Sequence, residues 1–157
     1  MSGDLADLRD LYQDVILDHG RRPRHGHRLA VFDASAKGDN PMCGDRVEVF
    51  VRHAADGTIA ETGFEARGCA ISIASADLMA EMIVGRAPAD ARALFASFRD
   101  MARTGACPAC EASLAEPLER LAPLAGVHEY PSRVKCATLP WHALIAALDG
   151  AKEASSE

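Results

Sequence analysis

The sequence predicts an α+β fold, with a small three-stranded antiparallel sheet and helices packed on one face of it. Two observations lead to this prediction. Alternating, strand-like segments occupy the part of the chain before residue 68, and segments rich in Ala, Leu and Met with helical spacing follow from residue 70. Strands followed by a run of helices are typical of α+β domains, in which helices cover one side of an antiparallel sheet.

The sheet is predicted from three segments. Residues 45–54, "DRVEVFVRHA", alternate with period two and place valines on one face. Asp-Gly at 56–57 is a hairpin signal, so residues 58–68, "TIAETGFEARG", are expected to return as the partner strand. Residues 28–36, "RLAVFDASA", form the third candidate strand. Together these segments predict an antiparallel sheet of three strands.

Five helices are predicted around this sheet. The first has an apolar stripe at helical spacing, and the fourth is interrupted by Pro117 and Pro123. The last is expected to begin at a cysteine and to be followed by a frayed polar tail over residues 151–157. The predicted helices cover residues 4–19, 70–85, 87–103, 110–126 and 136–150.

Length and composition predict a single domain over residues 1–150. The chain has 157 residues, 48% hydrophobic and 25% charged, which is ordinary for a globular protein. A net charge of −6 argues against general nucleic-acid binding. No apolar run is long enough to cross a membrane, and the N-terminus lacks a signal-peptide layout, so a cytoplasmic protein is expected. The basic segment 19–28 is either a solvated loop or a docking surface for an acidic partner.

Cysteine usage indicates metal or thiol chemistry. An odd number of cysteines without an export signal argues against a disulfide framework. Two of them are expected to open helices, where free N–H groups favour the thiolate that soft metals bind. Asp45 follows the first cysteine by two residues, so an extended backbone would point both side chains to one side. The five are Cys43, Cys69, Cys107, Cys110 and Cys136.

If three segments converge, Cys43, Asp45, Cys69 and Cys136 form a set of three sulfur ligands and one oxygen ligand. Such a set suits tetrahedral Zn²⁺, or an iron–sulfur cluster with one oxygen ligand. The simpler alternatives are that each cysteine is a small buried hydrophobic residue and that Asp45 belongs to a turn. Spacing alone does not decide between these interpretations.

Four motifs together resemble the iron–sulfur cluster assembly scaffold family that includes IscU and the NifU N-terminal domain, and in particular its SufU branch. They occur in order and cover most of the chain between residues 11 and 144. The motifs are "LYQDVILDHGRRPRHG", "DNPMCGD", "GCAISIASADLM" and "RVKCATLPWHAL".

This resemblance implies a fold, a ligand set and a partner. The SufU branch implies a zinc-dependent sulfurtransferase that takes persulfide sulfur from a SufS-type cysteine desulfurase and serves downstream iron–sulfur assembly proteins. Cys43 would accept the sulfur, and Asp45, Cys69 and Cys136 would hold zinc together with it. Lys135 and Arg133 flank the last cysteine and would stabilise the charge of a thiolate or persulfide, or else are simply exposed basic residues.

Two other functions stay open at this point. The chain could be a scaffold on which [2Fe–2S] clusters are assembled and passed on, or a zinc-stabilised adaptor that only activates the desulfurase. Scaffold-type IscU relatives carry a histidine where this chain has Lys135, and they lack the long segment between Cys69 and Cys136. Both differences favour the sulfurtransferase over the scaffold. Cys107 and Cys110 lie in that segment. They are a redox pair, half of another metal site, or residues without an essential role.

Overall fold

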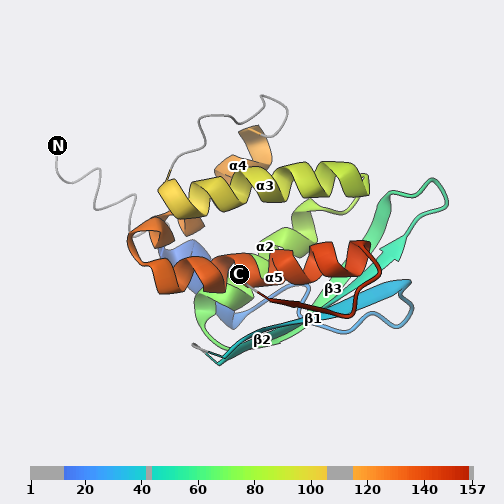
Figure 1. Ribbon diagram of the computed structural model, residues 1–157, viewed down its shortest axis with the longest axis horizontal. Helices are drawn as coiled ribbons and strands as arrows, with labels where there is room; N and C mark the ends of the chain where they lie inside the picture. The colour runs from blue at the N-terminus through green and yellow to red at the C-terminus, as the bar shows by residue number, and fades with distance from the viewer. Residues whose placement is uncertain (1–12, 42–43, 106–114, 156–157) are drawn as a thin grey trace.

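A four-stranded sheet carries the helices on one of its faces (Figure 1). The computed structural model describes residues 13–41, 44–105 and 115–155. The strand order is β3-β2-β1-β4; β1, β2 and β3 are antiparallel neighbours, whereas β4 runs parallel to β1. The strands are β1 (Ala34–Asn40), β2 (Asp45–His53), β3 (Ile59–Arg67) and β4 (Glu153–Ser155).

The prediction of a three-stranded antiparallel sheet is therefore wrong in one strand. Residues 153–155, expected to fray, pair with β1, and the carbonyl of Lys152 accepts a hydrogen bond from the backbone N–H of Lys37. The chain reverses at Gly150, whose φ of 79° is in the left-handed region that favours glycine. This short strand is held by backbone hydrogen bonds, which do not require alternating hydrophobic side chains. Its sequence therefore has no pattern that predicts a strand.

Strand β1 also lies further along the chain than predicted. Residues 28–33 form a loop, and the strand continues through Lys37, Gly38 and Asp39 because Asn40 pairs with Asp45 across the hairpin. Gly38 lies directly under α5 (Pro131–Leu148): a Cβ there would be 2.9 Å from Leu139 Cδ1. Residues 37–40 form a strand despite their polar sequence, because they pair with β2 across the hairpin. Gly38 among them allows α5 to approach closely.

The helices form two layers above the sheet. Helices α2 (Ala70–Met82) and α5 pack directly on the strands, and α3 (Pro88–Thr104) packs on α5 (Figure 1). The predicted helix over residues 110–126 is instead α4 (Ala115–Leu121) followed by the 3-10 helix η2 (Ala122–Glu129), with Pro123 near the junction. None of the described helices combines the length and apolar character needed to cross a bilayer.

A buried polar contact fixes α2 against α5. The Ser75 hydroxyl donates a hydrogen bond of 2.5 Å to the carbonyl of Ala137, and the Trp141 indole N–H donates one of 3.2 Å to the Ser75 hydroxyl. Ser75 and Trp141 are both fully buried. Because a buried polar group costs free energy when it has no partner, this pair of bonds favours one relative position of the two helices.

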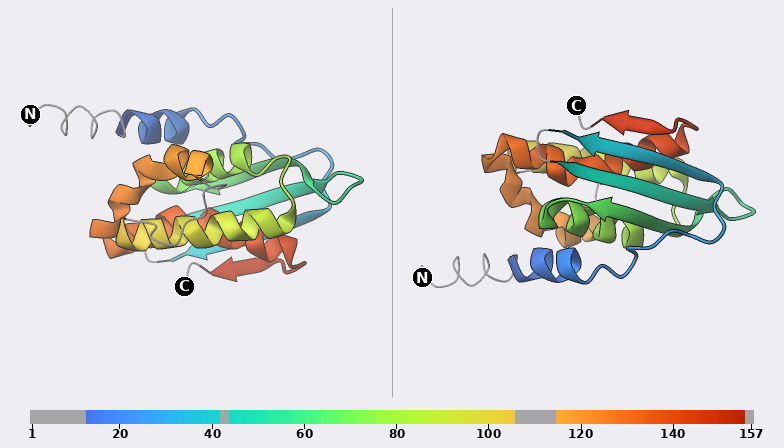
Figure 2. Two further views of the ribbon diagram at one scale, coloured as in Figure 1. Left: turned by 90° about the horizontal axis from the view of Figure 1, so that it is seen from above. Right: turned by 90° about the horizontal axis from the view of Figure 1, so that it is seen from below.

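The basic segment is anchored to α2 by a buried carboxylate. Asp77 is fully buried, its Oδ2 lies 2.5 Å from Nδ1 of His19, and its Oδ1 accepts a hydrogen bond from the backbone N–H of His25. His19 lies in the last turn of the described helix over residues 13–21, which lies beside α2 (Figure 2). His19 is therefore part of the packing of the fold, and the start of the basic segment is held in place.

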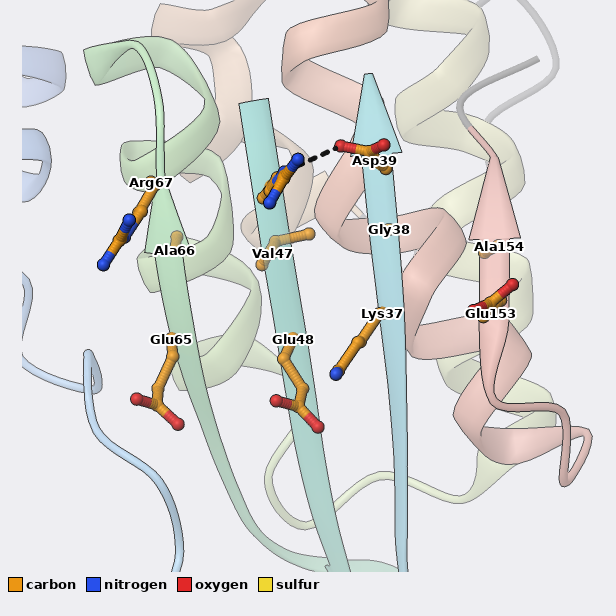
Figure 3. A pocket seen from close by; sticks show the side chains of 11 residues that line it. Lys37, Gly38, Asp39, Val47, Glu48, Glu65, Ala66, Arg67, Glu153 and Ala154 are labelled. Atoms are coloured by element: carbon orange, nitrogen blue, oxygen red, sulfur yellow. Dashed lines mark ion pairs between the residues drawn. The ribbon is translucent and has the colours of Figure 1, made fainter. Parts of the chain in front are cut away.

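The other face of the sheet carries charged side chains. Figure 3 looks onto this face with the helices behind it: the row Glu65, Glu48, Lys37 and Glu153 crosses all four strands, in agreement with the strand register. A shallow hollow of about 570 Å³ lies over these strands. The described helices thus cover one face only, as the sequence predicts.

The substitution Ser75→Ala should lower the free energy of unfolding by about 1–3 kcal/mol, because it leaves the buried Trp141 N–H without its acceptor. Urea denaturation followed by fluorescence measures this directly, since Trp141 is the single tryptophan of the chain. Ser35→Ala, on the half-buried face of β1, is the matched control and should change stability by less than about 0.5 kcal/mol. Equal midpoints for the two variants would contradict the role assigned to Ser75.

Candidate metal centre

Three metal-ligand side chains that are distant in the sequence meet at one end of the sheet. Asp45 is the first residue of β2, Cys69 immediately precedes α2, and Cys136 lies in α5. Their ligand atoms all lie within 4.8 Å of one another. Asp45 and Cys136 are fully buried, whereas Cys69 is partly exposed. The predicted convergence of these three residues is therefore present in the fold.

Strand register and helix packing bring the three together. Arg46 pairs with Arg67, so the start of β2 lies beside the end of β3, from which the chain passes through Gly68 to Cys69. The hydrogen bond from Ser75 to Ala137 places the neighbouring Cys136 against α2. The packing of the strands and helices thus fixes the position of each ligand residue. Asp45 lies at the start of β2 and Cys69 just after the end of β3, and Cys136 lies beside the Ser75–Ala137 hydrogen bond.

The Asp45 carboxylate is oriented by the backbone of Cys69. Its Oδ1 accepts a hydrogen bond of 2.9 Å from the Cys69 N–H, and its Oδ2 lies 3.7 Å from the Cys69 Sγ. Gly68 makes this approach possible: a Cβ at that position would be 2.0 Å from Oδ1, and its φ of 141° is one that side chains rarely adopt. One carboxylate oxygen is thus held by the backbone while the other lies near the Cys69 thiol.

This donor set fits a divalent metal ion. Tetrahedral zinc with ordinary Zn–S and Zn–O bonds would place a sulfur and an oxygen ligand about 3.6 Å apart, close to the 3.7 Å between Oδ2 and the Cys69 Sγ. Deprotonated, the two thiols and the carboxylate carry three negative charges in a largely buried place. Positive charge must offset them there, because unpaired buried charge is costly.

Arg133 supplies one such charge. The Cys69 thiolate, and next that of Cys136, hold the pKa of Arg133 above its usual value. Arg133 precedes Cys136 by three residues on α5, and residues three apart in a helix share a face. Arg133 itself is exposed, so its charge lies at the solvent side of the centre.

Lys135 lies elsewhere. It lines a hollow between α3, η2 and α5, together with Thr138 and His142. Adjacent residues in a helix point in directions about 100° apart, so Lys135 and Cys136 face different neighbours. Of the two basic residues predicted to support the site, the structure brings Arg133 to the cysteines and places Lys135 at a different surface.

The prediction that Cys136 opens a helix is wrong. Helix α5 begins at Pro131, a residue favoured in the first helical turn, so Cys136 is already in the second turn. Its Sγ lies 3.6 Å from the carbonyl of Ser132, one turn earlier. Cys69 does precede α2 directly, as its N-cap. Of these two cysteines, Cys69 lies at a helix N-terminus and Cys136 does not.

Cys43, Cys107 and Cys110 lie outside the described residues. The backbone between Cys43 and Asp45, predicted to be extended, is not extended at Gly44, whose φ is 72°. Gly68 and Ser75, which position Asp45 and Cys136, are not among the site residues predicted from the sequence. A glycine directly before the cysteine at a strand-to-helix junction was the available signal for the first of these.

Comparison with known proteins gives a consistent result. The family model described as "NifU-like N terminal domain" matches residues 11–137. The chain is 38% identical over 142 residues to the zinc-dependent sulfurtransferase SufU of Bacillus subtilis (strain 168), covering 88% of this chain and 90% of that protein. It is 36% identical over 140 residues to the iron–sulfur cluster assembly scaffold protein IscU of Streptococcus pyogenes serotype M1, covering 89% and 84% respectively.

The fold agrees with a solved structure. A crystal structure of a putative iron–sulfur cluster assembly scaffold protein for the SUF system, from Fervidobacterium islandicum AW-1, superposes with a TM-score of 0.75. It has 29% sequence identity, and the match covers 86% of this chain and 94% of that one. The agreement extends over the α+β architecture as a whole.

The substitution Gly68→Ala should weaken Zn²⁺ binding roughly tenfold or more, because the added Cβ displaces the Asp45 oxygen that the Cys69 N–H holds. Competition with a chromophoric chelator measures the affinity. Gly85→Ala is the matched control: its φ of 86° is also left-handed, but a Cβ there meets nothing within 4 Å. An equal loss of affinity in both variants would show that backbone strain, and not the contact with Asp45, is responsible.

Proposed function

This chain belongs to the NifU-like N-terminal domain family, and on that premise we propose that it is a zinc-dependent sulfurtransferase for iron–sulfur cluster assembly. In this proposal it accepts persulfide sulfur from a SufS-type cysteine desulfurase. The observation that carries the proposal is the gathering of Asp45, Cys69 and Cys136 at one end of the sheet.

Cys43 is proposed to complete the ligand set. Only Gly44 separates it from Asp45 in the sequence, and two peptide units span at most about 7.6 Å between Cα atoms. Cys43, Asp45, Cys69 and Cys136 would then bind Zn²⁺ through three sulfurs and one oxygen, a four-ligand set that suits tetrahedral zinc. Bound zinc would keep the thiols deprotonated and resistant to oxidation.

The proposed transfer uses the Cys43 thiolate as the nucleophile. It attacks the outer sulfur of the persulfide on the desulfurase, a new S–S bond forms on Cys43, and the old S–S bond breaks. The electron pair of the broken bond leaves with the desulfurase cysteine as its thiolate. One neutral sulfur atom moves, so the step needs no external oxidant or reductant.

Arg133 is proposed to support this step through its charge. It is exposed at the solvent side of the cysteines, where the persulfide of a partner must approach. A guanidinium there attracts the anionic persulfide and stabilises the thiolates that the exchange requires. Lys135 is less suited to this role, because its side chain lines the hollow between α3 and α5.

A scaffold that carries a [2Fe–2S] cluster is the second candidate. Its support is the similarity to the IscU protein of S. pyogenes, together with a sulfur-rich donor set that iron–sulfur clusters also use. Metal analysis of anaerobically purified protein separates the two functions. One tightly bound zinc per chain supports the sulfurtransferase, and a brown, iron-loaded protein supports the scaffold.

The substitution Cys43→Ser should abolish transfer of sulfur from the persulfide of the desulfurase while keeping part of the zinc affinity, since three ligands remain. Labelled cysteine supplied to the desulfurase, followed by mass spectrometry of this chain, measures the transfer. Cys107→Ser is the control, because it removes a thiol that the proposed ligand set does not include. Label retained by Cys43→Ser at the wild-type level would disprove the proposed acceptor.

The substitution Arg133→Gln should slow sulfur transfer roughly three- to tenfold at low salt and leave the zinc content unchanged, because the guanidinium acts by charge at an exposed position. The difference from the wild type should shrink as the salt concentration rises. Lys135→Gln removes the same charge two residues further along α5 and should have little effect on the rate. A larger effect of Lys135→Gln would reverse the assignment.

A further inference from the structure

A basic hollow lies on the side of α5 away from the metal centre. It has a volume of about 490 Å³ and lies between α3, η2 and α5. That volume is within the range of small-molecule sites. None of the described residues that line it is acidic. Its polar lining consists of Arg99, Arg103, His128, Lys135, Thr138 and His142.

The permanent positive charges of this hollow are not neutralised by the described part of the protein. Within it, no carboxylate lies within ion-pair distance of Arg99, Arg103 or Lys135. Elsewhere in the same part, some arginines pair with carboxylates and others do not; five are paired. These are Arg24, Arg46, Arg52, Arg92 and Arg120. Within the described residues, this hollow thus brings together three cations that have no carboxylate partner, in a chain with net charge −6.

Two of the basic groups are held by one aromatic ring. The Arg99 guanidinium lies 5.7 Å from the centre of the Phe95 ring, and the His142 ring packs edge-on against the same ring at 5.0 Å. Phe95 is itself buried and stacks on Trp141. Contacts of this kind restrict both side chains, so less ordering is needed when a ligand binds.

We propose that this hollow binds a small, doubly charged oxyanion of the phosphate class, such as the phosphate group of a phosphomonoester. Guanidinium groups match phosphate oxygens in geometry as well as charge, and a lysine and a histidine add further donors. Enclosure by three elements favours a compact ligand over an extended one.

This site is distinct from the metal centre. Lys135, Thr138 and His142 follow one another at spacings of three and four residues and share one face of α5. Cys136 belongs to the face that packs toward α2 and Asp45. The proposal therefore does not depend on the sulfurtransferase function.

Titration of the full-length protein with inorganic phosphate tests the proposal by calorimetry at constant ionic strength, with sodium chloride as the balancing salt. Saturable binding of one phosphate per chain is expected. Arg103→Gln should weaken it about tenfold or more, since it removes a charge-assisted contact. Arg103 is exposed, so this variant should fold normally, and its unfolding midpoint serves as a check.

Two control variants locate the bound phosphate. Arg92→Gln removes an arginine of the same helix that pairs with Asp149, and Arg133→Gln removes the cation of the metal centre. Both should bind phosphate as the wild type does. If Arg92→Gln weakened phosphate binding as much as Arg103→Gln does, the effect would come from net charge alone. If only Arg133→Gln weakened binding, the phosphate would be bound at the candidate metal centre. Either result would overturn the proposal, as would stronger binding of an oligoglutamate peptide.

His142 offers an independent readout. Burial, and next the charges of Arg99 and Arg103, hold the pKa of the His142 imidazole below its usual value. Lys135 and His128 line the same hollow. A bound anion offsets these charges, so the pKa of His142 measured by NMR should rise when phosphate saturates the protein. An unchanged pKa at saturation would place the phosphate outside the hollow.

Discussion

The candidate metal centre depends on a buried carboxylate whose two oxygens have different partners. Asp45 is fully buried, a position that is costly for an unpaired charge. The backbone N–H of Cys69 satisfies one oxygen, and the second lies 3.7 Å from the Cys69 sulfur. This division works only because Gly68 has no side chain to fill the space that the carboxylate occupies. A strand start, a helix start and a glycine between them therefore determine the donor geometry before any ion binds.

The centre also reports on the completeness of folding. Its described donors span residues 45–136, and they meet only when β2 has paired with β3 and α5 has packed on α2. A ligand that binds the native arrangement but not the unfolded chain stabilises the native state by mass action. Metal binding would therefore stabilise the hairpin, the helix pair and their mutual packing together. Such contacts, distant in sequence, are typically late in folding.

Sequence patterns predicted those parts of the fold that hydrophobic periodicity controls. Strands β2 and β3 and helices α2 and α3 begin and end within a few residues of the predicted positions. Helix α3 buries one face at helical spacing, whereas α2 is buried on almost all sides and was predicted from its apolar composition. The pattern failed where backbone pairing or local geometry decided: β4 has no apolar alternation, and Pro131 rather than Cys136 starts α5. For the site, residue type predicted the donors. Helical spacing from Cys136 already indicates that Arg133 and Lys135 lie on different faces of α5. What each face contacts became known only from the position of α5 in the fold.

Strand β4 determines where the chain leaves the domain. It runs parallel to β1, and Ser155 pairs with Asp39 near the hairpin that joins β1 to β2, so the polypeptide passes Ser155 at the end of the sheet where Asp45 lies (Figure 2). A protein fused directly after Ser155 would start its own fold close to the candidate metal centre. It would compete there with any docking partner. If the fused protein were itself that partner, the short tether would raise its effective concentration at the centre.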